Sequence, residues 1–290
     1  MATWIQLVVT GITMGSIYSL IGLGYVTIYR TSRIVNMAQG SFVMMGGYLT
    51  YSLFDQAGLP YWPSAILAVI SVVVISVAIY VAVLKWMKSF VNVVLATIGF
   101  LLLFEGIALV EWGPYGKSVP PFIDAGYLHA GGVAVDSQSL WVIGFMIVIA
   151  IGLHLLGTRT RVGKQMTATA TDPGAARMCG VRTSGMIILA FAVSAFVGAI
   201  GGVALAPMIP ITYQSGGLFG LIGMVGAILG GWGSSMGALI GGLAIGIIQS
   251  LVTGVLPAGW QTAVAFGVLI LILYFRPQGL LGTTMTEGEV

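Results

Sequence analysis

Residues 216–256 read GGLFGLIGMVGAILGGWGSSMGALIGGLAIGIIQSLVTGVL, and this stretch decides the fold class of the chain. It carries no Asp, Glu, Lys, Arg or His, and long apolar runs recur before and after it. Of 290 residues, 58% are hydrophobic and 7% are charged, whereas soluble domains average about 25% charged residues. So few charges cannot cover a water-exposed surface, which excludes an ordinary soluble enzyme. Because a helical span needs about 20 apolar residues, the sequence predicts an all-α, polytopic membrane protein.

Apolar runs separated by charged or proline-containing loops predict about eight or nine transmembrane or re-entrant helices. Two of the runs, residues 34–54 and residues 216–232, are rich in glycine and are expected either to cross or to re-enter. Non-helical backbone is tolerated at membrane depth where protein buries it. The predicted segments are residues 4–29, 34–54, 63–84, 91–110, 140–156, 185–206, 216–232, 236–256 and 263–275.

The positions of Lys and Arg predict which side of the membrane each loop faces. With the N-terminus outside and every predicted segment crossing, one set of loops carries all the bases except Lys117. Because cytoplasmic loops are enriched in Lys and Arg, we expect the N-terminus outside and the C-terminus in the cytoplasm. The bases on the predicted inner side are Arg30, Arg33, Lys85, Lys88, Arg159, Arg161, Lys164, Arg177, Arg182 and Arg276.

Two hydrophilic loops interrupt a chain that otherwise reads as a single integral-membrane domain over residues 1–290. Residues 113–139 form an irregular, proline-containing loop on the predicted extracytoplasmic face. Residues 158–184 form a basic loop on the predicted cytoplasmic face. The sequence therefore predicts no separate soluble domain.

The inner loop contains the pattern of one short helix. Asp172 is a favourable N-cap, and Pro173 suits the first helical position because its missing N–H is not needed there. Gly180 supplies the residue that ends the helix. So short a helix is not stable alone in water. Its apolar side chains, among them Ala176 and Met178, must therefore rest against membrane headgroups or in a groove on a partner protein.

The sequence offers no catalytic or metal-binding cluster. The single Cys179 excludes a disulfide framework, and His129 and His154 are too far apart for a metal-ligand pair. Residues 157–165, GTRTRVGKQ, resemble a phosphate loop, but the spacing is wrong and Gln165 replaces the Ser or Thr that holds Mg²⁺. No cofactor is expected in this chain. The net charge of +3 is too small to indicate a nucleic-acid partner.

Several polar residues inside the predicted spans are candidates for a translocation path or for a structural role. They are Asn36, Gln39, Ser41, Glu105, Gln249 and Thr253. An acid well inside a span must face protein, water or a base, so Glu105 either lines the path or hydrogen-bonds a neighbouring helix. Asn36, Gln39 and Ser41 either line the path or hold a broken helix. The last two lie four residues apart on one helix face, where they either line the path or bond another helix.

Four sequence blocks match the pattern of one protein family. They are residues 34–40 (IVNMAQG), residues 163–181, residues 230–242 (GGWGSSMGALIGG) and residues 275–282 (FRPQGLLG). They are similar to its first inner motif, its cytoplasmic coupling loop, its glycine-rich late motif and its closing signature. Their spacing agrees over nearly the whole chain. The sequence therefore resembles the integral permease subunit of the branched-chain amino acid ABC importers, a family that also includes urea and amide uptake systems.

The resemblance implies a transmembrane subunit of an ATP-driven importer that performs no catalysis itself. It implies two cytoplasmic ATPase subunits that bind ATP and Mg²⁺, a second related or identical permease subunit, and a periplasmic or extracellular solute-binding protein. The implied location is the bacterial inner membrane. The short basic-loop helix would dock in a cleft of an ATPase. The residues implied in this coupling are Arg161, Gly163, Lys164, Asp172, Pro173, Gly174, Ala175, Ala176, Arg177 and Gly180.

Some positions depart from the family pattern. Gln39 stands where the family often has His, Trp232 stands where a smaller aliphatic residue is usual, and Thr167 and Thr169 dilute the usually basic loop helix. The expected solute is a branched-chain or other apolar amino acid, in keeping with the scarcity of charge inside the spans. The alternative class is a stand-alone secondary transporter or channel for a small neutral solute. That class needs its own coupling or selectivity site, for which Glu105 is the one acidic candidate.

Overall fold

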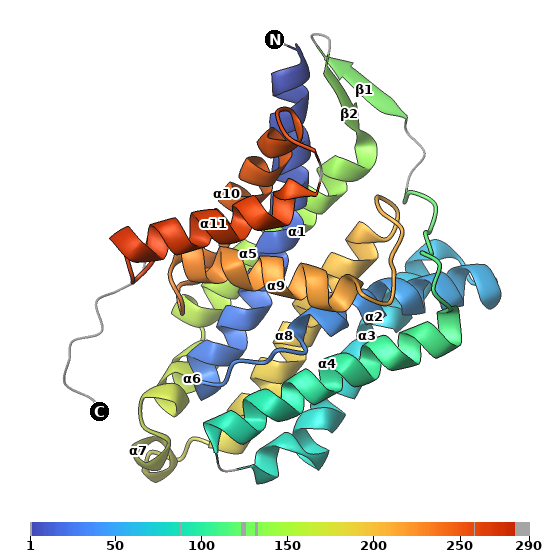
Figure 1. The fold of residues 1–290 in the computed structure, drawn as a ribbon. Coiled ribbons are helices and arrows are strands. Elements are labelled where there is room, and N and C mark those ends of the chain that lie inside the picture. Colours follow the sequence, from blue (N-terminus) through green and yellow to red (C-terminus); the bar gives the residue numbers. More distant parts are fainter. Residues whose placement is uncertain (1, 88, 123–125, 131–132, 258, 282–290) are drawn as a thin grey trace.

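The computed structural model describes residues 2–87, 89–122, 126–130, 133–257 and 259–281 (Figure 1). Lys88 and Gly282, which belong to the predicted inner loops and the closing motif, lie outside the described residues. The longer helices are α1 (Ala2–Ser32), α3 (Tyr61–Ala82), α4 (Phe90–Trp112), α5 (Ser137–Arg159), α8 (Thr183–Leu205) and α10 (Ser235–Thr253). The shorter ones are α2 (Gln39–Tyr51), α6 (Arg161–Thr171), α7 (Pro173–Met178), α9 (Ser215–Gly230) and α11 (Trp260–Phe275).

The predicted helical membrane fold is confirmed at the level of its segments. By length and composition, six helices within the described ranges are able to cross a membrane, and α9 and α11 are shorter apolar helices. Each predicted apolar segment coincides with a helix, with ends displaced by a few residues. The second segment differs most, because residues 34–38 are not helical and α2 begins only at Gln39. The number of complete crossings and the orientation of the termini stay predictions.

The loop at residues 113–139 is more ordered than expected. It contains a two-stranded antiparallel hairpin, β1 (Tyr127–Ala130) and β2 (Val133–Asp136), in which Tyr127 pairs with Asp136. The expectation of an irregular loop is therefore corrected by this small element, while the all-α fold class is confirmed. A Gly-Gly pair in the sequence separates two segments that contain strand-favouring residues, which is a hairpin pattern. Figure 1 shows the hairpin beside the N-terminus of α1, with α6 and α7 at the opposite end of the molecule.

Glycine permits the closest helix contacts. A Cβ atom on Gly246 in α10 would collide with the backbone of Gly15 in α1, and one on Gly230 in α9 would collide with the backbone of Gly237 in α10. Between α9 and α10 the chain turns through Gly231, whose φ of 114° favours glycine. Apolar attraction between helices is weak in lipid, so close backbone approach of this kind supplies the packing energy. The glycine-rich residues of α9 and α10 thus allow close helix packing.

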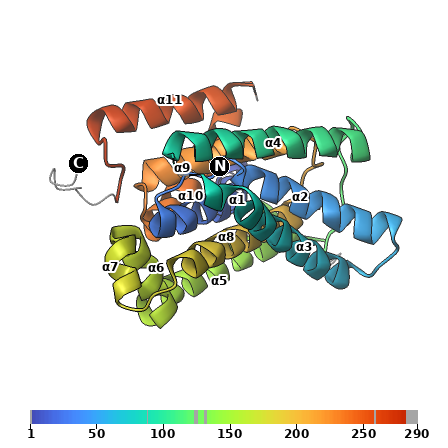
Figure 2. The ribbon, with the colours of Figure 1, turned by 90° about the horizontal axis from the view of Figure 1, so that it is seen from below.

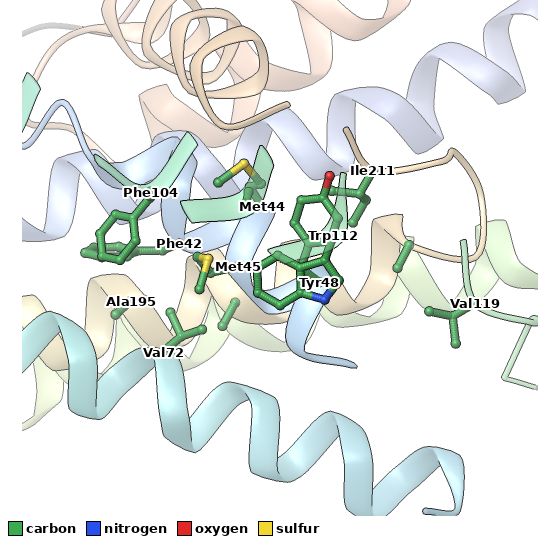
Figure 3. Packing of buried hydrophobic residues seen from close by; sticks show 13 residues of the cluster. Phe42, Met44, Met45, Tyr48, Val72, Phe104, Trp112, Val119, Ala195 and Ile211 are labelled. Carbon is green, nitrogen blue, oxygen red and sulfur yellow. The ribbon is translucent and has the colours of Figure 1, made fainter. Parts of the chain in front are cut away.

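Helix α2 is enclosed by other helices. It contacts α3, α4, α8 and α9, and Figure 2 shows it between α4 and α3. The buried side chains of Phe42, Met44 and Met45 pack into a cluster with residues of the surrounding helices (Figure 3). Tyr48 stacks on Trp112 of α4, with 4.7 Å between ring centroids and 18° between ring planes. The segment that sequence reasoning left open is thus the most enclosed helix of the bundle.

Candidate functional site

The helix predicted in the inner loop is confirmed as α7. The Asp172 carboxylate accepts hydrogen bonds from the backbone N–H groups of Gly174 at 2.7 Å and Ala175 at 3.0 Å. Pro173 occupies the first helical position, where a backbone N–H would have no acceptor within the helix, so the N–H that proline lacks is not missed. At the other end Gly180 has a φ of 80°, and its N–H donates to the carbonyl oxygen of Arg177 at 3.0 Å. Local caps at both ends therefore hold this short helix.

A second helix, α6, precedes α7 and was not identified from pattern alone. The Thr160 hydroxyl caps it by accepting from the N–H of Gly163 at 3.1 Å. Gly163, Met166 and Thr169 are buried and recur every three residues, which is the signal that indicates a helix with one packed face. A Cβ atom on Gly163 would collide with the backbone of Leu156, so glycine permits α6 to lie against the end of α5.

Helix α7 presents most of its surface to solvent. It contacts α6 and α8, and among its residues only Ala176 is buried. The Met178 side chain is 91% exposed. Asp172, Pro173, Gly174, Ala175 and Arg177 are exposed, as are Arg161 and Lys164 on α6. The structure therefore leaves most of the predicted coupling residues exposed on α6 and α7, while Gly163 and Ala176 are buried. Whether an ATPase binds this surface stays a prediction.

The predicted path residue Gln39 is fully buried between three helices. Its Nε2 donates to the carbonyl oxygen of Ser194 in α8 at 3.1 Å. The Ser194 hydroxyl lies 2.6 Å from Gln39 Oε1 and 2.8 Å from the carbonyl oxygen of Gly24 in α1, and it donates to one of them at a time. This geometry favours the structural alternative for Gln39, in which it holds α1, α2 and α8 together. Ser194 was missed because its partners are distant in sequence.

Three buried polar atoms at α2 have no hydrogen-bond partner in the described part of the chain: Asn36 Nδ2, Ser41 Oγ and Tyr48 OH. Ser41 and Tyr48 are seven residues apart and share one face of α2, and Asn36 lies just before the helix. A buried polar group without a partner costs about 1–3 kcal/mol. Sequence reasoning selected Asn36 and Ser41 but missed Tyr48, which reads as an ordinary core aromatic residue.

Glu105 hydrogen-bonds a neighbouring helix. One carboxylate oxygen accepts from the N–H of Gly217 at 3.0 Å, in the first turn of α9. The first N–H groups of a helix lack partners within it, and its N-terminus attracts negative charge. Glu105 of α4 thus caps α9 from outside. This arrangement favours the alternative of a helix-to-helix bond.

Gln249 and Thr253 do not act as one pair. Gln249 is buried, and its Nε2 lies 3.4 Å from the carbonyl oxygen of Gln261 in α11. Thr253 is exposed and donates to the carbonyl oxygen of Ser250 in its own helix at 2.6 Å. The structure therefore gives Gln249 a cross-helix bond, while Thr253 lies apart from the polar residues around α2. Among the residues that the structure describes, no group of His, Cys, Asp and Glu is arranged to hold a metal ion.

Comparison with known proteins identifies the family. Residues 7–273 match the family model described as "Branched-chain amino acid transport system / permease component". The chain belongs to this permease family. The high-affinity branched-chain amino acid transport system permease protein BraD of Pseudomonas aeruginosa is 26% identical over 299 residues, which cover 98% of this permease and 97% of the relative. LivH of Escherichia coli K12, which carries the same description, is 26% identical over 302 residues, with the same coverage.

More distant matches agree with this result. The autoinducer 2 import system permease protein LsrC of Photorhabdus luminescens is 29% identical over 207 residues, which cover 67% of this permease and 59% of that protein. Among solved structures, PsaBC from Streptococcus pneumoniae in complex with Fab matches with a TM-score of 0.50 and 14% identity, over 96% of this chain and 91% of that chain. This last likeness concerns the fold alone. The permease is a multi-pass membrane transport protein of the ABC importer type.

Proposed function

We propose that this permease is the transmembrane subunit of an ATP-driven importer for a small apolar amino acid, with α7 as the contact for a separate ATPase. The observation that carries the proposal is the exposure of a helix that is capped at both ends. Local caps fix the shape of α7, yet the described chain leaves most of its surface uncovered, including the 91% exposed Met178. A short, rigid, partly apolar helix of this kind suits a groove on a partner protein.

Helix α6 supports a coupling role because it connects α7 to the core. It contacts α1, α5 and α8, and the glycine contact at Gly163 leaves little room for it to slide on α5. A displacement of α7 by an ATPase would therefore reach α8 directly and α1 through α6. Movement of packed helices as rigid bodies is an established form of transport switch. Arg161, Lys164 and Arg177 would supply positive charge around the contact.

We place the translocation path along α2. The partnerless atoms of Asn36, Ser41 and Tyr48 support this placement, because a solute or water in an open path would satisfy them. The N-terminal turns of α2 and α9 meet where Gly40 contacts Gly216. Gln39 would then hold α2 against α8, and Glu105 would hold α9 against α4, rather than binding solute.

The remaining assignments follow from the charge pattern and the family. We propose that the N-terminus and the β1–β2 hairpin face outward, where a solute-binding protein docks, and that α6 and α7 face the cytoplasm of a bacterium. Two ATPases, which bind ATP and Mg²⁺, and a second permease subunit complete the assembly. The amino-acid relatives BraD and LivH support a branched-chain solute. So does the scarcity of charged residues within the spans.

Flux of radiolabelled leucine into liposomes tests the proposal. The purified permease alone should carry no more leucine than protein-free liposomes do. The complex purified from its native membranes, with ATP and the solute-binding protein present, should accumulate leucine, and unlabelled valine should compete while lysine should not. Leucine flux through the permease alone would overturn the proposal and favour the secondary transporter or channel.

A further inference from the structure

A basic cavity of about 500 Å³ lies at the end of the molecule that carries α6. It is bounded by the last turns of α1 and α5, by α6, and by the turn between α9 and α10. Arg30 and Arg33 line it, together with hydroxyl groups such as that of Thr158. None of its described lining residues is acidic. The cavity therefore has the charge and polarity to receive an anion of considerable size.

The two arginines are held at the cavity by neighbouring side chains. Arg30 Nη1 donates to Ser235 Oγ in the first turn of α10 at 3.1 Å. The Arg33 guanidinium lies over the ring of Tyr29 at 5.5 Å from its centroid. Tyr29 in turn meets Trp232 edge to face, with 5.3 Å between centroids. Trp232, where this sequence departs from the family pattern, thus forms an aromatic wall of the cavity.

An apolar groove of about 270 Å³ continues from the basic cavity. The two share His154, Ser235 and Met236 as lining residues. Beyond this border the groove runs between α5 and α10, over side chains such as Ile151 and Leu239. Ile151 is 55% exposed, on the outer surface of a helix long and apolar enough to span the membrane. A polar cavity that opens into an apolar groove matches the two parts of a lipid molecule.

We propose that the cavity and the groove together bind one anionic phospholipid. Its phosphate is held by Arg30 and Arg33, whose guanidinium groups favour phosphate oxygens. One acyl chain lies in the groove between α5 and α10. Anionic lipids are abundant on the cytoplasmic side of membranes, where the charge pattern places this end of the chain. A free phosphate would occupy the basic cavity but would leave the groove unexplained. The bound lipid would brace α1, α5, α6 and α10 beside α7, and this binding does not depend on ATP coupling.

Native mass spectrometry of the delipidated full-length permease tests the proposal, with phosphatidylglycerol and phosphatidylcholine of identical acyl chains as probes. We expect at least one phosphatidylglycerol molecule to bind about tenfold more tightly than phosphatidylcholine, because both lipids carry the phosphate but the positive choline group is repelled by the basic cavity. Arg33→Gly should abolish this preference. Because Arg33 has a φ of 56°, glycine suits its backbone and the variant should fold. Lys85→Ala removes a base that packs on Trp86, outside the cavity, and should retain the preference.

A second pair of variants separates a lipid from a soluble anion. Ile151→Trp fills the groove and should weaken phosphatidylglycerol binding, whereas Leu102→Trp, at a 61% exposed position on α4, should not. Inorganic phosphate and glycerol phosphate serve as headgroup probes. Equal binding of the two lipids, or an unchanged preference in a monodisperse Arg33→Gly sample, would overturn the proposal. A third outcome would also overturn it: millimolar phosphate displaces phosphatidylglycerol, and Ile151→Trp has no effect on lipid binding. That combination would indicate a site for a soluble anion.

Discussion

The short helices α2 and α7 are held in opposite ways. In α2 only Leu49 and Tyr51 are not fully buried, and no side chain caps its N-terminus. In α7 only Ala176 is buried, and Asp172 caps the N-terminus. Tertiary packing therefore stabilises α2, whereas local hydrogen bonds stabilise α7. Changes around α2 should unfold the protein, and changes in α7 should leave the fold intact while altering what binds to it.

The largest effect is expected at Gly202 in α8, where the backbones of α8 and α2 approach each other closely. A Cβ atom there would collide with the carbonyl group of Val43, whereas one on the adjacent Gly201 would meet nothing nearer than Leu20 Cβ at 3.8 Å. Gly202→Ala should therefore lower the free energy of unfolding by about 3 kcal/mol, because backbone must move to relieve the overlap. Chemical unfolding in mixed micelles measures this change.

Gly201→Ala is the matched control, one residue away on the same buried helix. It should be neutral or slightly stabilising, since alanine restricts the unfolded chain more than glycine does. If both variants unfold alike, the contact between α2 and α8 is looser than the structure indicates. The contrast between the two short helices would then lose its basis.

A smaller effect is expected at Glu105, which joins α4 to the start of α9. Glu105→Ala removes an ionic hydrogen bond and leaves the Gly217 N–H without its acceptor, so unfolding should become easier by about 2 kcal/mol. Glu105→Gln keeps an acceptor oxygen and should lose about half as much. Thermal unfolding in detergent measures both variants. Glu111 is exposed on the same helix, so the control variant Glu111→Gln should leave the unfolding temperature unchanged.

Leucine uptake separates the two roles of Glu105. If Glu105 only caps α9, Glu105→Gln should transport at the wild-type rate in liposomes that contain the complete importer. Reduced transport by a Gln variant of normal stability would instead place the carboxylate in the path.

Asp172 should matter less for the fold and more for coupling. Asp172→Ala removes both capping bonds at the start of α7 and should destabilise that helix by about 1 kcal/mol. The melting temperature of the whole permease should not change, because α7 contributes little buried surface. Stimulation of the partner ATPase should fall. Asp172→Asn retains a capping oxygen and should still stimulate the ATPase. If Asp172→Asn also loses ATPase stimulation, the negative charge of Asp172, and not its capping hydrogen bonds, is required for coupling.

The same contrast explains what the sequence could predict. Asp172, Pro173 and Gly180 signal α7 from neighbouring positions, so its cap, its start and its end were predictable. The start of α2 was not predictable, because residues 34–38 leave the helix where Thr97 of α4 accepts a hydrogen bond from the Met37 N–H at 3.1 Å. The partner of Glu105 lies in α9, far away along the chain. In the sequence, Thr97 and Glu105 are visible as polar residues inside an apolar segment. Only the packing of the folded chain determines which hydrogen bonds they make.

The smallest effect on stability is expected at Met178, and it separates fold from function most clearly. Its side chain is 91% exposed, so Met178→Ser removes almost no packing and should change the free energy of unfolding by less than about 0.5 kcal/mol. If α7 fits an apolar groove of an ATPase, however, the lost methionine contact should weaken ATPase binding about tenfold, because a buried side chain of this size is worth at least that much. Surface plasmon resonance with the permease in nanodiscs measures the affinity.

Val110→Ser, at an 87% exposed position on α4, supplies the control and should leave ATPase binding unchanged. Equal affinity of the Met178 variant and the wild type would show that the exposed face of α7 is not the contact surface, since no neighbouring residue of α7 offers comparable apolar area.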